Sequence, residues 1–232
     1  MKPSVLDETE DFAVVFKPPR LHCAPLKNSE ADTLLDWYAT LFPPVMELSG
    51  RRKGDGGLLH RLDFETQGLV LFAKNQKSLD FLLRQQEEGY FIKEYSALCQ
   101  KGDSPPKPEG FVIESYFRPF GPGRKEVRPV MDTVGKNKEL AKDKGAFYRT
   151  EIISVSKTEQ GYLSFALRLR RGFRHQIRSH LAWIGCPVLN DLLYGSAAAG
   201  RSNNDFLTLR ANGLVFNNPG NGIQQKYRIE PL

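Results

Sequence analysis

The chain has 232 residues, enough for one large domain or two small ones. Hydrophobic residues make up 40% and charged residues 26%, the balance of an ordinary globular protein, and no apolar run reaches the ~20 residues that a membrane-spanning helix needs. The 33 Lys and Arg residues against 27 Asp and Glu residues give a net charge of +6, which is compatible with an acidic partner such as nucleic acid.

The first residues and the cysteines indicate a cytoplasmic protein. Acidic residues occupy the place where a signal peptide would have its apolar core, so we expect none at the N-terminus. Cys23, Cys99 and Cys186 lie far apart and form no C-x-x-C pair. This spacing argues against a disulfide scaffold and against a structural zinc site, and it favours small, buried, reduced side chains.

The first half of the chain predicts strands alternating with helices. The expected elements are a strand over 11–17, a helix within 31–42, a basic glycine-rich surface loop over 51–57, a buried strand over 69–73, a helix to about residue 88 and a strand over 91–99. Pro43 and Pro44 end the first helix. Asn75 is the expected N-cap of the second helix, and Gly89 its C-terminal stop.

The second half predicts a loop over 101–110 and a segment over 119–144, rich in Gly, Pro and Lys, that projects from the body. A hairpin over 148–155 and 162–169 is expected to turn around Gly161, and a short helix over 175–184 follows. Asn212-Gly213 predicts a second hairpin between 207–211 and 214–216. With no repeat and no linker, the sequence predicts a single α+β domain over 1–232 with a mostly antiparallel sheet and flanking helices.

A charged cluster over 60–74 stands just before the buried strand. Gly68 would permit a sharp turn, so that Asp63 is held at the mouth of a cleft. The alternative is that Asp63 pairs with Arg61 or caps a turn.

A basic cluster over 170–180 carries four arginines within nine residues, beside a predicted helix N-terminus that favours anions. Arg174 and Arg178 are four apart and share a face, and Arg178 lies at the edge of the buried stripe. The alternative is a solvated basic face without a ligand.

These segments resemble the RluA-type family of pseudouridine synthases. The family motif H-R-L-D-x-x-T-x-G-L is matched from His60 to Leu69, and Lys93-Glu94-Tyr95 is similar to its K-x-Y segment. Three further segments resemble the family in the same order and extend the match over nearly the whole chain: 11–24, 175–195 and 207–219. Four positions depart from the usual pattern. Gln67 stands where the family usually has Ser, Asn190 where it has Gly, and Arg210 where it often has His. Arg174 lies one position later than the arginine of the family pattern.

The resemblance implies an RNA-modifying isomerase with a central RNA-binding cleft. Asp63 would start cleavage of the bond between sugar and uracil, either by attacking the anomeric carbon or by removing the neighbouring sugar proton. Both routes need an ionised carboxylate, which a nearby cation stabilises, and Arg178 is the candidate. Tyr95 would stack on the uracil and offer its hydroxyl, with Leu207 or Leu209 on the other side.

The resemblance also implies RNA contacts from other motif positions. Arg61 would fill the gap left by a flipped uridine, or contact a phosphate. The other expected RNA-binding residues are His60, Arg171, Arg174, His175 and Gln176. The reaction is redox-neutral, so no cofactor and no metal is implied. We expect a monomer that acts on transfer RNA or ribosomal RNA and lacks the extra N-terminal RNA-binding module of many family members.

Three other interpretations compete with this one. A metalloenzyme would use His175 and His180, but these are five apart, whereas zinc pairs on a helix are four apart. A protein kinase would explain His60-Arg61-Leu62-Asp63, but Leu62 interrupts the H-R-D motif and no glycine-rich loop precedes it. A catalytically silent RNA-binding protein of the same fold is the third, and the intact Asp63, Tyr95 and Arg178 argue against it.

Overall fold

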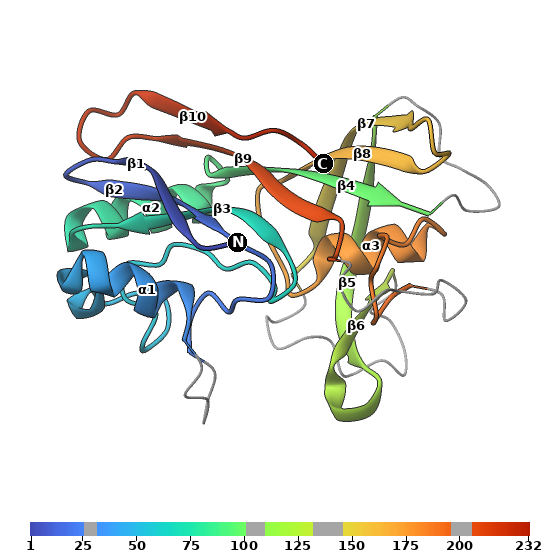
Figure 1. Cartoon of the computed structure of the whole chain (residues 1–232), viewed down its shortest axis with the longest axis horizontal. Coiled ribbons are helices and arrows are strands. Elements are labelled where there is room, and N and C mark those ends of the chain that lie inside the picture. Colours follow the sequence, from blue (N-terminus) through green and yellow to red (C-terminus); the bar gives the residue numbers. More distant parts are fainter. Residues whose placement is uncertain (26–31, 101–109, 132–145, 196–205) are drawn as a thin grey trace. The chain divides into compact units, whose positions relative to one another are not determined.

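The computed structural model describes residues 1–25, 32–100, 110–131, 146–195 and 206–232 (Figure 1). Contacts divide the chain into two compact units, one of Met1–Lys93 with Arg210–Pro231 and the other of Glu94–Leu209 with Leu232. The sequence did not predict this division. The boundary falls inside two strands, β4 (Ile92–Cys99) and β9 (Leu209–Asn217), so no linker composition marks it.

The first unit is built on a sheet of four further strands around β9. Strand β1 (Ser4–Glu8) pairs antiparallel with β2 (Phe12–Lys17), and β2 pairs antiparallel with β3 (Gln67–Ala73). A short parallel bridge joins β3 to β9, and β9 pairs antiparallel with β10 (Gln224–Arg228). The α+β class and the mostly antiparallel sheet are therefore confirmed.

Helix α2 begins and ends where the sequence predicts, and α1 lies within the predicted range 31–42 and ends before Pro43. Helix α1 (Leu34–Leu41) starts at a capping box in which Thr33 and Asp36 exchange hydrogen bonds, and η1 (Pro43–Glu47) follows it. Helix α2 (Gln76–Glu88) starts at Asn75, whose side chain accepts a hydrogen bond from the Ser78 N–H. It ends at Gly89 in the left-handed conformation, because glycine has no Cβ to oppose it.

Strand β3 is buried at every position, because the two helices cover opposite faces of it. Leu69 and Leu71 belong to the same core cluster as Leu79 and Leu82 of α2. On the other face Phe72 contacts Tyr38 of α1, with 4.6 Å between the ring centroids. Each fully buried leucine contributes roughly 2 kcal/mol, so the strand that leads out of the Asp63 segment is firmly anchored.

In its described residues, the second unit contains an antiparallel array of strands and one α-helix. Strand β5 (Phe111–Phe120) pairs with β6 (Glu126–Val130) and with β7 (Tyr148–Lys157), and β7 pairs with β8 (Leu163–Leu169). The hairpin around Gly161 is thus confirmed. Helix α3 (Gln176–Trp183) contacts β6 and β7, and the structure confirms the helix predicted there.

The described part of the 119–144 segment is regular. Residues 119–130 lie mainly in β5 and β6, and η2 (Pro122–Arg124) lies in the connection between these strands. Val127 is buried in a core cluster with Phe117 and Tyr148. Residues 132–145, and all but Gly110 of the predicted 101–110 loop, lie outside the described residues.

Two turns predicted from glycine are wrong. Asn212-Gly213 lies inside β9, because the strand pairs there with β10, and the β9–β10 connection lies over 218–223 instead. Gly68 forms no sharp turn but lies in β3 at φ 130°, against the backbone of Ala211. A glycine is needed there because the backbones of β3 and β9 approach closely. The glycine in the sequence is therefore explained by close packing of two strands and not by a turn.

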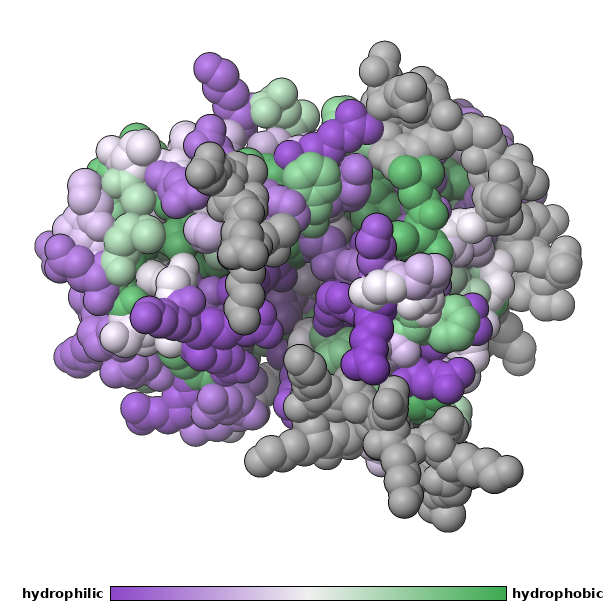
Figure 2. All heavy atoms as spheres, turned by 90° about the horizontal axis from the view of Figure 1, so that it is seen from below, coloured by the Kyte–Doolittle hydropathy of each residue, from purple (hydrophilic) through white to green (hydrophobic). Residues whose placement is uncertain are grey.

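The surface carries both hydrophilic and hydrophobic side chains, in line with a sequence of 40% hydrophobic and 26% charged residues. On the face that Figure 2 shows, hydrophilic side chains gather over the first unit, with hydrophobic ones scattered among them. Within the parts of the chain that the structure describes, no helix has both the length and the apolar character required to cross a membrane.

We predict that Gly68→Ala lowers the free energy of unfolding by about 3 kcal/mol or more, through steric overlap added to an unfavourable φ. A Cβ at Gly68 would lie 2.1 Å from the Ala211 carbonyl oxygen. Gly54→Ala is the control, since Gly54 also has a positive φ (85°) but nothing within 4 Å of its Cβ position. Urea denaturation compares the two variants, and equal losses would contradict the close-packing explanation.

Candidate active site

Asp63 opens a tight turn that leads directly into β3. The Thr66 N–H donates to the Asp63 carbonyl at 3.1 Å, which closes the turn. Just before it, the chain runs along β3, where the Leu59 N–H donates to the Leu71 carbonyl at 3.0 Å. The half-buried Asp63 is therefore carried by a short loop whose two ends are both fixed to the same buried strand.

The buried ammonium group of Lys17 ties this turn to the end of β2. It donates to the carbonyls of Pro18 at 2.9 Å, Leu21 at 2.8 Å and Phe64 at 3.2 Å, and the side chain is fully buried. The Phe64 carbonyl also accepts the Leu21 N–H at 3.3 Å. The Phe64–Glu65 peptide group, one residue beyond Asp63, is thus held by one ammonium donor and one amide donor.

Leu62, the residue before Asp63, is held by the side chain of Cys23. The Leu62 N–H donates to Cys23 Sγ at 3.2 Å, and Cys23 Sγ donates to the Leu62 carbonyl at 3.5 Å. Cys23 is buried, as the sequence predicts, and here its thiol replaces a backbone partner. With Lys17 on one side and Cys23 on the other, little backbone freedom remains at Asp63.

Lys17 also supplies a positive charge beside Asp63 within the first unit. Burial lowers the pKa of Lys17 to about 8, and the nearby carboxylates of Asp63 and Glu65 oppose that shift. Sequence reasoning assigned the supporting cation to Arg178 alone and missed Lys17. The available signal was a lysine that ends an otherwise apolar strand.

His60 and Arg61 are placed differently although they are neighbours. His60 is buried and accepts the Leu71 N–H at Nε2 (3.3 Å), and burial lowers its pKa well below the usual range. Arg61 is exposed and forms an ion pair with the buried Asp55. Asp55 lies in the segment expected to be a surface loop, so residues 55–57, which are buried, correct that expectation.

Two departures from the family pattern contact one another. Arg210 Nη2 donates to Gln67 Oε1 at 3.2 Å, and the backbones of the same two residues face each other in the β3–β9 bridge. The two unusual residues therefore form one interacting pair. The third departure, Asn190, has φ 63°, a conformation in which Asn is the best tolerated replacement for Gly.

In the second unit Arg178 forms a buried two-point ion pair with Asp191. Arg178 Nε donates to Asp191 Oδ2 at 2.7 Å, and Nη2 donates to Oδ1 at 2.8 Å. The Tyr194 ring lies 5.3 Å from the guanidinium carbon. Tyr194 is held in turn, since its hydroxyl accepts the Val127 N–H at 2.8 Å and lies 3.1 Å from His175 Nδ1.

Of the other residues in the basic cluster, some are buried and some are exposed to solvent. Gln176 is buried and hydrogen-bonded to Phe173, Arg149 and Thr150 of its own unit, so its contacts are internal. Arg174 is exposed and donates to the carbonyls of Arg124 at 2.7 Å and Glu126 at 3.1 Å.

Two neighbouring arginines are exposed at the end of β8. Arg171 lies over the Tyr148 ring at 5.2 Å. Arg170 is ion-paired with Glu151 at 3.6 Å. Both guanidinium groups are therefore anchored on the surface of the second unit while remaining open to solvent.

Tyr95, Leu207 and Leu209 are all buried and belong to the second unit. The segment that carries the two leucines runs beside β4, because the Leu98 N–H donates to the Thr208 carbonyl at 3.0 Å. Leu207 and Leu209 flank Thr208, and the alternation of an extended chain places them on one face.

His180 has the environment of a structural residue. Its two ring nitrogens lie 2.9 Å from the Ser115 hydroxyl and 2.8 Å from the Thr150 hydroxyl, and burial lowers its pKa to about 4. In the described ranges, no group of three or more His, Cys, Asp and Glu side chains is arranged to hold a metal ion.

The chain belongs to the RNA pseudouridylate synthase family, whose model matches residues 11–183. The match contains Asp63, Tyr95 and Arg178. The solved structure of human RNA pseudouridylate synthase domain containing 1 has the same fold, with a TM-score of 0.72 at 20% identity over 99% of this chain and 83% of that one.

Two curated relatives extend the comparison. An uncharacterized RNA pseudouridine synthase of Helicobacter pylori is 27% identical over 98% of this chain and 66% of its own length. Ribosomal large subunit pseudouridine synthase D of Haemophilus ducreyi is 28% identical over 83% of this chain and 52% of its own length. The chain thus spans between half and two thirds of the length of these relatives.

We predict that Lys17→Met lowers the free energy of unfolding by about 3 kcal/mol, because three carbonyl groups lose a charged donor in a buried place. Lys226→Met on the exposed face of β10 is the matched control, with an expected change within about 0.5 kcal/mol. Chemical denaturation measures both. A loss at Lys17 no larger than at Lys226 would contradict its role as the tie between β2 and the Asp63 turn.

Proposed function

We propose that this protein isomerises uridines of RNA to pseudouridine and that Asp63 starts the reaction. The observation that carries the proposal is the fixed turn at Asp63, which lies within the family match and has anchored peptide groups on both sides. A carboxylate held in this way is preorganised, so little ordering is left to the moment of reaction.

The chemistry requires the glycosidic bond to break, the base to rotate and a carbon–carbon bond to form. Asp63 acts either as the nucleophile at the anomeric carbon or as the base that removes the neighbouring sugar proton. Both routes use the ionised carboxylate, and Lys17 places a positive charge in the same part of the first unit. The isomerisation is redox-neutral, so these residues need no redox cofactor.

Tyr95 and Arg178 are assigned to the same reaction by their places in the family motifs. The ring of Tyr95 provides a flat face for the uracil, and its hydroxyl is available for a proton transfer. Arg178 supplies a permanent positive charge and directed hydrogen-bond donors. Leu207 or Leu209 is assigned to the opposite face of the uracil, and Arg61 to the space that a flipped uridine leaves.

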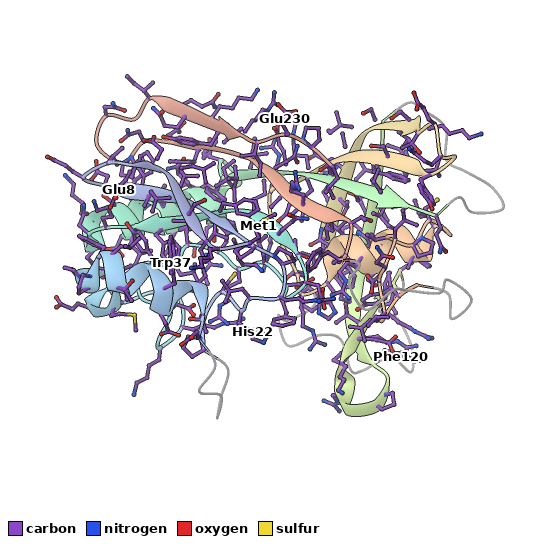
Figure 3. The ribbon with its side chains drawn as sticks, in the orientation of Figure 1. Met1, Glu8, His22, Trp37, Phe120 and Glu230 are labelled. Atoms are coloured by element: carbon purple, nitrogen blue, oxygen red, sulfur yellow. The ribbon has the colours of Figure 1, made fainter. Side chains whose placement is uncertain are left out.

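We assign RNA contacts to two exposed basic groups of the second unit. The first is the arginine patch of Arg170, Arg171 and Arg174. The second is the end of the β5–β6 hairpin near Phe120, which Figure 3 labels. Arg124 and Lys125 are exposed in its turn, and the guanidinium carbon of Arg128, on β6, lies 3.2 Å from the centroid of the Phe120 ring. Because Arg174 is bonded to carbonyls of this turn, the two groups form a connected basic surface.

We also make proposals about the RNA substrate, the oligomeric state and the cellular compartment of the protein. Transfer RNA and ribosomal RNA are both candidates, and the name of the Haemophilus ducreyi relative supports the second. We propose a monomer in the cytoplasm, where its three buried cysteines would stay reduced. The alternative function is RNA binding without catalysis, and it predicts that Asp63 is dispensable for everything the protein does.

We predict that Asp63→Asn reduces the rate of pseudouridine formation by at least about a thousandfold, which corresponds to about 4 kcal/mol of transition-state stabilisation. The amide keeps the size of the side chain but is neither a nucleophile nor a base. The measurement is pseudouridine formed under single-turnover conditions, with the dissociation constant for RNA determined separately.

Glu65→Gln is the matched control for Asp63→Asn. It removes a carboxylate from the same turn, at a residue that pairs with Arg20 at 3.7 Å, and should leave the rate within about threefold. A parent-like rate for Asp63→Asn would contradict the assignment of Asp63 and favour the non-catalytic alternative.

We predict that RNA binding weakens steeply with salt, with log K falling against log salt by about 0.7 for each phosphate that is neutralised on unpaired RNA. Arg171→Ala should lower that slope by about 0.7. Arg149→Ala, an exposed arginine of β7 paired with Glu114 at 2.9 Å, is the control and should leave the slope unchanged. Equal slopes for the parent and Arg171→Ala would remove Arg171 from the RNA-binding surface.

A further inference from the structure

The carboxylate of Asp191 accepts hydrogen bonds both from Arg178 and from its own stretch of backbone. Besides the Nε and Nη2 donors of Arg178, its Oδ1 accepts the N–H groups of Leu193 at 3.0 Å and Tyr194 at 3.1 Å. None of the side chain is exposed, and the Arg178 side chain is only 7% exposed. The carboxylate is thus fixed by its own backbone before it fixes the arginine.

The two-point contact determines how the guanidinium group is turned. Asp191 engages Nε and Nη2, which lie on one edge of the planar group, so rotation of the plane would break both hydrogen bonds. The Nη1 edge consequently points away from Asp191. The Tyr194 ring lies 5.3 Å from the guanidinium carbon and further limits its movement.

The segment that carries both neighbours of Arg178 is itself braced. Asn190 Nδ2 donates to the Phe206 carbonyl at 3.0 Å, and the Gly195 N–H donates to the Asp191 carbonyl at 2.9 Å. Tyr194 is tied to β6 through the Val127 N–H. Asp191 therefore joins Arg178 to a rigid part of the second unit rather than to a free side chain.

We propose that Asp191 is a positioning residue that holds the guanidinium group of Arg178 in the single orientation used in the reaction. The inference rests on the proposed function, because it takes the role of Arg178 from there. Asp191 touches neither RNA nor the reacting atoms in this account. It acts by turning the charge of Arg178 from a mobile cation into a set of directed donors.

The test compares Asp191→Asn with the parent protein under single-turnover conditions. The amide retains the shape but loses one acceptor and the charge, so the rate should fall by about 10- to 100-fold while the dissociation constant for RNA changes less than about threefold. Glu114→Gln, which breaks the exposed pair with Arg149 in the same unit, should keep the parent rate. A folded Asp191→Asn protein with the parent rate would overturn the proposal.

A double variant separates positioning from an independent effect. If Asp191 acts through Arg178, Asp191→Asn should slow an Arg178→Lys protein by less than twofold, because the guanidinium group is already gone. Penalties that multiply in the double variant would overturn the proposal. If Asp191→Asn does not fold, Asp191→Glu replaces it in the test. The longer side chain displaces the carboxylate, so the single-turnover rate should fall by a similar factor. A parent-like rate for Asp191→Glu would contradict the positioning role.

A readout independent of activity distinguishes this proposal from the proposed function. The side-chain Nε–H of Arg178 should give a resolved, slowly exchanging NMR signal in the parent protein, and Asp191→Asn should abolish it. If the parent protein forms no pseudouridine, the proposed function fails. The signal still decides the positioning: its loss in Asp191→Asn supports the proposal, and its persistence overturns it.

Discussion

The buried ammonium group of Lys17 is the interaction on which the Asp63 turn depends. A charged group without water needs strong partners, and Lys17 finds them in three carbonyl oxygens that come from two separate stretches of chain. The same contacts that stabilise the charge therefore fix the backbone beside Asp63. One side chain therefore contributes both to the stability of the first unit and to the fixed backbone of the Asp63 turn, together with Cys23 on the other side.

The second unit uses a different solution for its buried cation. Arg178 is paired with a carboxylate rather than with carbonyls, and the planar guanidinium group is oriented by two hydrogen bonds instead of being held at a point. Lysine suits the first place, where a compact charge must join converging carbonyls. Arginine suits the second, where direction matters. Exchange between the two residue types at either place would be unfavourable although the charge is retained.

Local signals predicted much of the fold from sequence. Asn75 and Gly89 identify both ends of α2, because helix capping is determined by the residues next to the helix. The apolar run before Lys74 identifies β3, because a short run of apolar residues is itself the mark of a buried strand. Gly68 gave a wrong turn prediction because its conformation is set by β9, which comes from a distant part of the chain. Asn212-Gly213 gave one because β9 continues through it and pairs with β10 beyond a later connection. Local chemistry does not distinguish a glycine needed for a turn from one needed for close packing.

For the candidate site, the resemblance proposes Asp63, Tyr95 and Arg178, and these assignments stay predictions. The sequence did not predict the long-range contacts that the structure shows around the site. Lys17 contacts the Phe64 carbonyl 47 positions away, and Arg210 contacts Gln67 across 143 positions. Such pairs leave no periodic pattern in a single sequence. They become visible only when the sheet brings the distant segments together.

Formation of pseudouridine by the unmodified protein tests the central claim most directly. RNA from cells that lack this gene, labelled with tritium at C5 of uridine, is incubated with the purified protein, because C5 loses its hydrogen when the new bond forms. The account predicts tritium release that matches newly formed pseudouridine at discrete positions, without added metal or cofactor. RNA that binds to the protein but releases no tritium would contradict the account.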